Sequence, residues 1–397
     1  MPSPEPLSAS LPLGDDWQAL LASVARAKGW PASAKELAGP VAELSKVYNG
    51  LAPEGSSRGD RALAARLGFS FPRDVAKGAC AVRELVSSGL LAAHGGSVSV
   101  LDIGAGMGAM SVGVAIALAK AGQRGSIDAT WVDSDLEAMR AGEAVVRAAS
   151  RIGGIELSLR GLSHRDAKEA SGVFDLVIAG QVLSELDRAY GEAERADLHA
   201  EWLKTTLRER VSHSGALVVV EPALRDRTRH LHRVRERLMA SEAVTLFAPC
   251  LHRAACPALA TKGDWCHEDL PLDLPEWLVP LARAAGLRWE GLTFSYLVLR
   301  RDGATLRSVA SNARGLVRVV SSALVSKGKR EMLLCGETAE GPGRARPFVL
   351  DRERDNRGAW DSAVRGDLLS FDPPVGSGRL ALDAVRTELV DDLSPRR

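Results

Sequence analysis

The sequence predicts a doubly wound α/β domain, preceded by a helical region and followed by a small β module. Two observations carry this prediction. Short β-rich apolar runs alternate with helical stretches between residues 97 and 300, and a glycine-rich turn separates the first run from the first of these helices. Strands that alternate with helices are typical of βαβ units in a parallel sheet. With 397 residues, the chain is expected to hold a main domain and smaller modules.

Helical periodicity dominates residues 1–94, which are expected to form a helical N-terminal region. The next expected strands are 97–103, 127–132, 156–160, 174–179 and 216–220, and the helices between them are 109–121, 136–152 and 192–213. A helix at 276–286 and a closing hairpin of 288–294 and 296–300 would complete a Rossmann-like, seven-stranded domain over 95–304. Residues 245–270 form a cysteine-rich insertion in this domain.

The chain after residue 305 loses its helical periodicity. Short strand-like pieces are expected at 316–321, 331–335, 347–350 and 368–371, between glycine-rich turns. They predict a small basic β module over 305–372, followed by a tail over 373–397.

Composition limits the classes of protein that fit. The formal net charge is only +1, so any polyanion site must come from local patches. The sequence has neither an apolar run long enough to span a bilayer nor a secretion signal. The odd count of five cysteines argues against a disulfide framework. We therefore expect a cytoplasmic, monomeric protein that does not contact membranes.

A glycine-rich turn follows the first expected strand in the sequence LDIGAGMG at 101–108. Its glycines allow a sharp turn and let the backbone approach a ligand closely. Gly104, Gly106 and Gly108 alternate strictly, unlike the generic dinucleotide fingerprint, and Asp102 stands two residues before the first of them. This spacing resembles motif I of class I methyltransferases, in which the carboxylate orients the loop and helps hold the methionine amino group.

Two further features agree with this resemblance. Asp133 ends the next strand, where a carboxylate can accept both ribose hydroxyls of a nucleoside. The fourth strand ends at Gly180 and Gln181, in the position that faces the sulfonium in such enzymes. A tight turn without a ligand, or a site for NAD, is the alternative. The predicted S-adenosylmethionine-binding residues are Asp102, Gly104, Ala105, Gly106, Gly108, Asp133, Ser134, Gly180 and Gln181.

No residue can be assigned to catalysis from the sequence. The fourth strand lacks both the Asn/Asp-Pro-Pro-aromatic sequence often used for amino-group methylation and a nucleophilic cysteine. Glu185 could act as a base, although a carboxylate on a helix surface is the simpler interpretation. The catalytic residues therefore stay unknown.

Three of the five cysteines lie within 17 residues, at Cys250, Cys256 and Cys266. Thiolates select zinc, copper(I) or iron–sulfur clusters, and this long, irregular spacing suits a 4Fe-4S cluster better than a zinc knuckle. Cys335 would complete an all-thiolate site if it folds back onto the insertion, and the cluster would then staple the insertion to the β module. Zinc, or three incidental cysteines, is the alternative. We expect Cys80 to be a core residue of a helix.

Two basic segments are candidates for contact with phosphates. Arg225, Arg229, Arg233 and Arg237 recur every four residues and form one stripe on a helix. Lys327, Lys329 and Arg330 form a basic turn in the β module. The arginine stripe could instead be a solvated helix face with internal ion pairs, and a basic β module is compatible with RNA binding without being diagnostic of it. Because aromatic residues are scarce near the basic turn, contact with the RNA backbone is favoured over base stacking.

Several of these segments resemble one known family, the methyltransferase-like assembly factors of the mitochondrial ribosomal small subunit and their bacterial relatives. The matching segments are the glycine loop, Gly180–Leu186, Val220–Pro222, Ala248–His252, Cys256–Pro257 and Asp264–His267. The resemblance implies binding of small-subunit rRNA, and a cluster carried by Cys250, Cys256, Cys266 and Cys335. Leu251 and Glu268 depart from residues that are common in the family, and neither is a ligand.

We therefore expect an S-adenosylmethionine-binding, iron–sulfur protein of small-subunit assembly that binds rRNA and assembly intermediates. An active rRNA methyltransferase is the first alternative, with the target base extruded beside the sulfonium. A small-molecule methyltransferase with structural zinc is the second.

Overall fold

The computed structural model describes residues 6–49, 51, 59–163, 172–354, 358–382 and 387–390. The chain divides into two compact units, and each of them is assembled from separate segments. The first unit comprises residues 1–82, 92–180 and 271–292, and the second comprises 83–91, 181–270 and 293–397. The predicted domain over 95–304 is thus shared between the two units.

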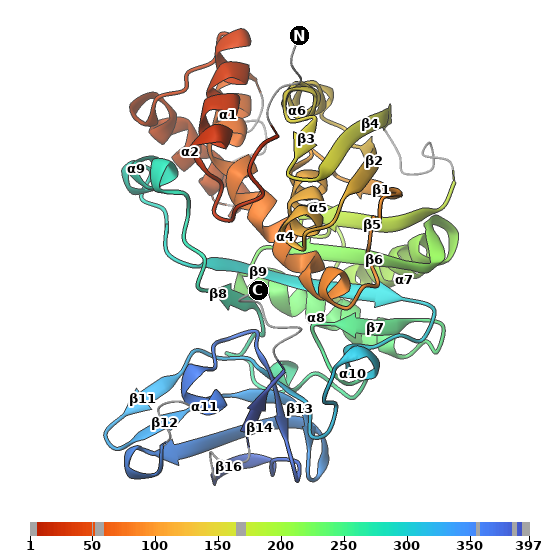
Figure 1. Ribbon diagram of the computed structural model, residues 1–397, viewed down its shortest axis with the longest axis vertical. Helices are drawn as coiled ribbons and strands as arrows, with labels where there is room; N and C mark the ends of the chain where they lie inside the picture. Colours follow the sequence, from red (N-terminus) through yellow and green to blue (C-terminus); the bar gives the residue numbers. More distant parts are fainter. Residues whose placement is uncertain are drawn as a thin grey trace. The chain divides into compact units, whose positions relative to one another are not determined.

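The first unit begins with helices and continues into a mostly parallel sheet (Figure 1). The sheet order is β3-β4-β2-β1-β5, in which β1, β2, β4 and β5 are parallel and the two-residue β3 is antiparallel to β4. Helices α5 and α6 pack on β4. The elements are α1 (Asp15–Ala27), α2 (Ala34–Tyr48), α3 (Asp60–Ala65), a π-helical turn (Arg66–Ser70), α4 (Phe71–Ser87), β1 (Ser97–Ile103), α5 (Ala109–Lys120), β2 (Gly125–Val132), α6 (Leu136–Ala148), β3 (Arg151–Ile152), β4 (Ile155–Ser163), β5 (Phe174–Gly180) and α9 (Val279–Ala284).

The parallel strands and their crossover helices confirm the predicted α/β, Rossmann-like fold class. Close packing places α4 beside α5. A Cβ atom at Gly113 of α5 would lie 2.5 Å from the carbonyl oxygen of Val75 and 2.7 Å from the amide nitrogen of Ala79. The absence of a side chain at this position therefore lets the two helix backbones touch.

The second unit contains a small antiparallel sheet in the order β6-β9-β7, with β8 paired to β9. Helices α7 and α8 pack on each other and on β6. The elements are α7 (Glu192–Arg210), β6 (Val211–Glu221), α8 (Arg225–Met239), β7 (Thr245–Ala248), β8 (Glu268–Leu270), β9 (Leu292–Arg300) and α10 (Leu306–Val309).

The expected hairpin of 288–294 and 296–300 is wrong, because these residues contribute one strand, β9. Every residue of β9 except Thr293 is buried, and Ser295 sits in the strand without a turn. The stretch between the two expected strands has no Gly, Pro or Asn that could reverse the chain. The strand instead runs antiparallel to both β6 and β7.

The same unit carries the C-terminal β module, drawn in blue in Figure 1. Its sheet order is β11-β12-β14-β13-β10-β15-β17, with β16 added beside β14. Val317, Met332, Val349, Trp360 and Phe371 are among the buried residues of its core. The strands are β10 (Val317–Val319), β11 (Leu324–Ser326), β12 (Lys329–Glu331), β13 (Leu334–Thr338), β14 (Gly341–Leu350), β15 (Leu368–Phe371), β16 (Gly378–Ala381) and β17 (Thr387–Leu389), and α11 is Ala359–Ser362.

The range 373–397, expected as a tail, contributes β16 and β17 to this sheet. Residues 383–386 and 391–397 of that range lie outside the described part of the chain. In the part that is described, no helix combines the length and the apolar character needed to cross a membrane.

A buried ion pair ties the β module to the rest of the second unit. Arg318 of β10 donates from Nη2 to Glu84 Oε1 at 2.5 Å, and Tyr296 Oη donates to Glu84 Oε2 at 2.8 Å. The side chains of Arg318 and Glu84 are only 4% and 1% exposed. Burial alone would raise the pKa of Glu84, but Arg318 and Arg83 outweigh burial and lower it. Glu84 is therefore held as a carboxylate.

We predict that Arg318→Gln lowers the free energy of unfolding by about 3–5 kcal/mol, because it removes the nearer of the two guanidinium groups that compensate the buried carboxylate. Urea denaturation of the variant measures this loss. The matched control is Arg314→Gln, which breaks an exposed pair with Asp372 at 2.9 Å and should cost less than about 1 kcal/mol. Equal losses in the two variants would contradict the prediction.

Candidate functional site

The glycine loop of the first unit is held tightly against neighbouring side chains. Gly104, Gly106 and Gly108 have φ values of +69°, +53° and +78°, in the left-handed region. A Cβ atom at Gly108 would lie 1.9 Å from the ring of Trp131, so this position accepts no side chain. The loop therefore presents backbone, rather than side chains, at the carboxyl end of β1.

Asp102 lies under this loop and is fully buried. Its Oδ2 accepts hydrogen bonds from Ser111 N at 3.1 Å and Ser111 Oγ at 2.7 Å, and Trp131 Nε1 donates to Ser111 Oγ at 3.0 Å. Among the described residues, Asp102 Oδ1 has no hydrogen-bond partner. Burial raises the pKa of Asp102 to about 7. A cationic ligand such as the methionine amino group would satisfy the free oxygen and stabilise the carboxylate.

Asp133 closes the loop from the end of β2. Its Oδ2 accepts from Gly106 N at 2.7 Å, and its Oδ1 accepts from Asp135 N at 2.7 Å. In this state both carboxylate oxygens are used by backbone amides, and a ribose would have to share them. Ala105 is buried, and Ser134 is exposed beside Asp133.

The remaining two predicted residues lie at the end of β5. A Cβ atom at Gly180 would meet the side chain of Met110 at 2.7 Å, so a bare backbone is needed there. Gln181 belongs to the second unit, has a φ of +64°, and donates from its backbone N to Val220 O at 2.6 Å. Sequence reasoning missed Ser111 and Trp131, which hold Asp102. The only signal for Ser111 is a polar residue in an otherwise apolar helix.

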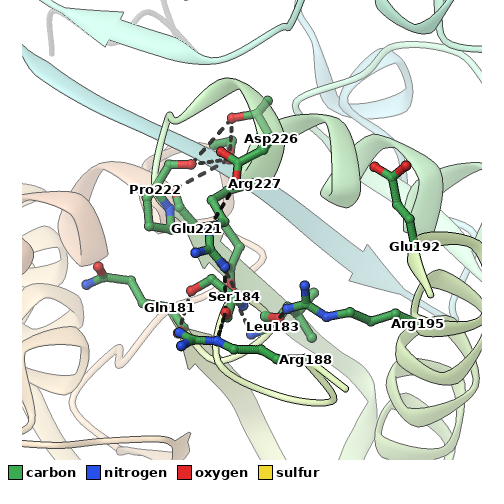
Figure 2. A network of polar contacts seen from close by, with 12 residues as sticks. Gln181, Leu183, Ser184, Arg188, Glu192, Arg195, Glu221, Pro222, Asp226 and Arg227 are labelled. Atoms are coloured by element: carbon green, nitrogen blue, oxygen red, sulfur yellow. Dashed lines mark hydrogen bonds and ion pairs between the residues drawn. The ribbon is translucent and has the colours of Figure 1, made fainter. Parts of the chain in front are cut away.

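In the second unit, a network of arginines and one buried glutamate fixes the turn after Gln181 (Figure 2). Glu221 accepts from the backbone N atoms of Leu183 at 2.9 Å and Ser184 at 3.1 Å. Arg188 and Arg227 both donate to Ser184 O, at 3.0 and 2.6 Å. Burial raises the pKa of Glu221 to about 7.

Arg195 completes this network by donating to the carbonyl oxygens of Leu183 and Leu186. Glu185, the candidate base, lies exposed in the same turn rather than on a helix. The turn is thus held by its backbone, and its polar groups are largely used in positioning it. Sequence reasoning missed Glu221, although it follows a buried strand in the motif Val220-Glu221-Pro222.

Four cysteines from distant parts of the second unit line one cavity of about 40 Å³. Cys250 follows β7, Cys256 precedes a short 3₁₀ turn (Pro257–Leu259), Cys266 precedes β8, and Cys335 lies in β13. The structure therefore brings Cys335 to the three cysteines of the insertion. Cys80 lies on α4 and does not line this cavity.

Basic side chains surround the four thiols. Arg235 of α8 is buried and donates to the carbonyl oxygens of His252 at 2.5 Å and Ala254 at 2.8 Å. Arg344 of β14 also lines the cavity and pairs with Asp264. His252 Nε2 lies 3.4 Å from Cys335 Sγ. Arg235 and Arg344 therefore place positive charge beside the four cysteines.

Three of the four thiols are costly to ionise without a positive centre. Burial and the neighbouring Cys250 together raise the pKa of Cys335 to about 12. Burial likewise raises the pKa values of Cys256 and Cys266. Metal ligation needs thiolates, so a bound metal centre would have to supply the compensating charge.

In the described ranges of the chain, no three His, Cys, Asp or Glu side chains converge closely enough to hold one metal ion. A single zinc ion needs each sulfur about 2.3 Å from one point. Four cysteine thiolates are the donor set of a four-iron cluster, and the four cysteines that line the cavity match this set in number and type.

The predicted RNA-contacting arginines of α8 differ in their surroundings. Arg225 is exposed at the start of the helix. Arg229 donates to the carbonyl oxygens of Ala258 at 3.0 Å, Thr261 at 2.8 Å and Asp264 at 2.6 Å, and so holds the insertion. The other two pair with carboxylates of α7, Arg233 with Glu192 and Arg237 with Asp197.

The three basic side chains of the turn in the β module also differ in their surroundings. Lys327 is exposed between β11 and β12. Lys329 pairs with Glu331 at 2.6 Å. Arg330 is directed to the protein instead, since it donates to Ala363 O at 3.0 Å and lies 4.0 Å from Asp361.

Comparisons with known proteins add a family match. The family model described as mitochondrial small ribosomal subunit Rsm22 matches residues 96–344. No curated protein matches the sequence. Solved methyltransferase structures are similar to parts of the chain, at low identity.

Three of these structures illustrate the range of sequence identity, coverage and TM-score. PKMT2 from Rickettsia typhi, solved with AdoHcy, is 16% identical, with a TM-score of 0.26 over 43% of this chain, and the chain spans 29% of that protein. The plantazolicin methyltransferase BpumL, solved with SAH, is 13% identical, with a TM-score of 0.35 and coverages of 68% and 97%. An O-methyltransferase family protein from Burkholderia thailandensis is 17% identical, with a TM-score of 0.30 and coverages of 73% and 73%.

The raised pKa of Asp102 predicts a pH-dependent cost to stability. Between the ordinary value of 3.8 and about 7 the folded state binds the proton more tightly, so folding becomes less favourable as pH rises through this window. Asp102→Asn keeps an acceptor for Ser111 and cannot ionise. Relative to wild type, its free energy of unfolding should rise by roughly 1 kcal/mol per pH unit across the window.

Urea denaturation between pH 4.5 and 8 measures this difference. Asp175→Asn removes an exposed carboxylate on the neighbouring strand β5 and serves as the control. If the difference from wild type varies with pH identically for both variants, burial of Asp102 does not carry the predicted cost.

Proposed function

This chain belongs to the family described as mitochondrial small ribosomal subunit Rsm22, and from this membership we propose that it assists assembly of the small ribosomal subunit. In this proposal it binds S-adenosylmethionine, a 4Fe-4S cluster and rRNA. It acts in the cytoplasm, as a monomer, on assembly intermediates. The observation that carries the proposal is the meeting of four widely separated cysteines at one cavity, in a chain of a ribosomal family.

Cys250, Cys256, Cys266 and Cys335 would hold the cluster. When bound, the cluster would supply iron–thiolate bonds that cross-link the insertion to β13 of the β module. The protein itself contributes two nearby guanidinium groups, Arg235 and Arg344, which favour a centre that carries net negative charge. His252 lies against the Cys335 sulfur and orients it.

The glycine loop would hold S-adenosylmethionine at the carboxyl end of β1, which would bring a methyl group on a sulfonium. Asp102 supports this role because its buried carboxylate keeps one oxygen free of hydrogen bonds to described residues. Gly104 and Gly106 open the backbone to the ligand. The proposal does not require methyl transfer, because the polar groups of the turn at residues 183–186 make hydrogen bonds that hold the turn itself in place.

We predict that the protein, purified anaerobically, contains about four iron and four sulfide per chain. Cys335→Ser should lose most of the iron, because one of four ligands is removed. Cys80→Ser is the matched control and should keep it, since Cys80 does not line the cavity. Metal and sulfide analysis of the three proteins decides the point, and stoichiometric zinc without sulfide would establish the zinc alternative instead.

Loss of the cluster should also loosen the β module, since β13 would no longer be joined to the insertion. Limited proteolysis of Cys335→Ser is therefore expected to release fragments of residues 305–390 sooner than in Cys80→Ser. Identical digestion of both variants would show that the cluster does not staple the two segments.

Association with the ribosome separates the proposal from its alternatives. We expect the wild-type protein to co-sediment with small-subunit assembly particles, and rRNA from a deletion strain to retain all its methyl groups by mass spectrometry. Loss of one methyl mark would favour an active rRNA methyltransferase. Absence from ribosomal particles would favour a small-molecule methyltransferase.

A further inference from the structure

The outer face of the β module carries an unusual group of charges around Glu331. The carboxylate accepts from Lys329 Nζ at 2.6 Å, Arg346 Nε at 2.8 Å and Arg379 Nη2 at 2.6 Å. These three cations come from three different strands, β12, β14 and β16. One carboxylate therefore organises three cations, and the group keeps a net charge of +2.

Strand register explains why these side chains share one face. Glu331 is paired with Phe348, and Arg346 is paired directly with Arg379. Residues two apart on a strand point to the same face, so Lys329, Glu331, Arg346 and Phe348 line up together. Ala345 and Val349, the intervening positions of β14, are buried in the core of the module. The charged group therefore lies on the face opposite to the core.

The cations reach solvent while their anchor does not. The side chain of Glu331 is 3% exposed, whereas those of Arg346 and Arg379 are 46% and 48% exposed. Two like charges directly opposite each other on neighbouring strands are unfavourable, and a shared carboxylate reduces this cost. Hydrogen bonds from Arg379 and Lys329 lower the pKa of Glu331 to about 2, so the anchor stays ionised.

An aromatic ring completes the group. Phe348 is partly exposed, with Arg379 Cζ 4.9 Å and Lys329 Nζ 5.6 Å from its ring centroid. Contact with the ring fixes the guanidinium of Arg379 from one side while Glu331 fixes it from another. Both arginines are thus held in place before any ligand arrives, which lowers the entropy cost of binding.

We propose that this face, formed by Lys329, Arg346, Phe348 and Arg379 around Glu331, binds the phosphate backbone of single-stranded RNA. Guanidinium groups bind phosphate oxygens in pairs of parallel hydrogen bonds, and two of them stand side by side here. Cations combined with a flat ring suit a chain of phosphates and bases. The inference rests on the proposed rRNA binding and names where that binding occurs.

The same charges could be an internal network without a ligand. That interpretation explains the pairing of each cation with Glu331, but it leaves two positive charges uncompensated and two guanidinium groups half exposed. It also does not explain why one sheet face concentrates them. Arg330, in the same strand as Lys329, shows the contrasting case of a side chain turned toward the protein.

The test is binding of a fluorescein-labelled 20-nucleotide oligouridine by the full chain at 50–200 mM salt. The variant Arg346→Gln/Arg379→Gln should bind about tenfold more weakly at 0.1 M salt. The slope of log affinity against log salt should fall by about 1.4, the value for two lost phosphate contacts to a single strand. The control Arg314→Gln/Arg352→Gln removes the same charge from exposed sites elsewhere in the module.

The outcomes separate the inference from the function on which it rests. Equal weakening by both double variants would overturn this face as the site, and so would tighter binding of a labelled polyglutamate peptide than of RNA. A wild-type protein that binds no RNA would overturn the rRNA-binding function itself. If the double variant unfolds at a lower temperature, the single Arg346→Gln decides, because Lys329 and Arg379 still neutralise Glu331 in it.

Discussion

The hydrogen bonds of the buried Arg318 guanidinium are the interactions on which the cysteine site most depends. Arg318 is buried on β10 and donates to Pro249 O at 2.8 Å, to Gly366 O at 2.8 Å and to Glu84. Pro249 immediately precedes Cys250, and Arg318 is itself paired in register with Cys335. One side chain thus positions the first and the last of four sulfurs that lie 85 positions apart in the sequence. Glu84 makes its burial tolerable, since an unpaired guanidinium in the core would be strongly destabilising.

Packing around Cys335 shows a second constraint on the same site. A Cβ atom at Gly336 would lie 2.4 Å from Leu316 O and 3.1 Å from Leu251 Cδ1. Any side chain there would push β13 away from β10 and from the insertion. Leu251, one of the two departures from the family pattern, therefore packs against the strand that carries Cys335. Leu251 thus contributes apolar packing next to Cys250, and the four cysteines line one cavity.

Local patterns allowed much of the fold to be predicted, and long-range pairing explains what they missed. The strand, glycine turn and helix over 97–120 follow from residues adjacent in sequence, and the structure contains them. The hairpin expected in 288–300 failed because periodicity cannot distinguish two short strands from one long buried strand. Asp102 was predicted from its spacing to the glycines, but its support by Ser111 and Trp131 depends on tertiary contacts. The position of Cys335 likewise depends on the register of β10 with β13, which no local pattern encodes.

Counts of charged residues along the sequence were equally limited as a guide to the RNA-binding surface, because a guanidinium group can bind either a partner or its own protein. On α8, Arg229 and Arg235 donate hydrogen bonds to backbone carbonyl oxygens of the insertion. Arg235 lines the cysteine cavity and Arg229 holds residues 258–264 of the insertion, so both arginines bind their own protein. On the outer face of the β module the balance is reversed, since three cations share one carboxylate and two of them remain half exposed. A phosphate backbone is attracted by positive charge that no carboxylate neutralises. Side chains of β12, β14 and β16 supply such charge.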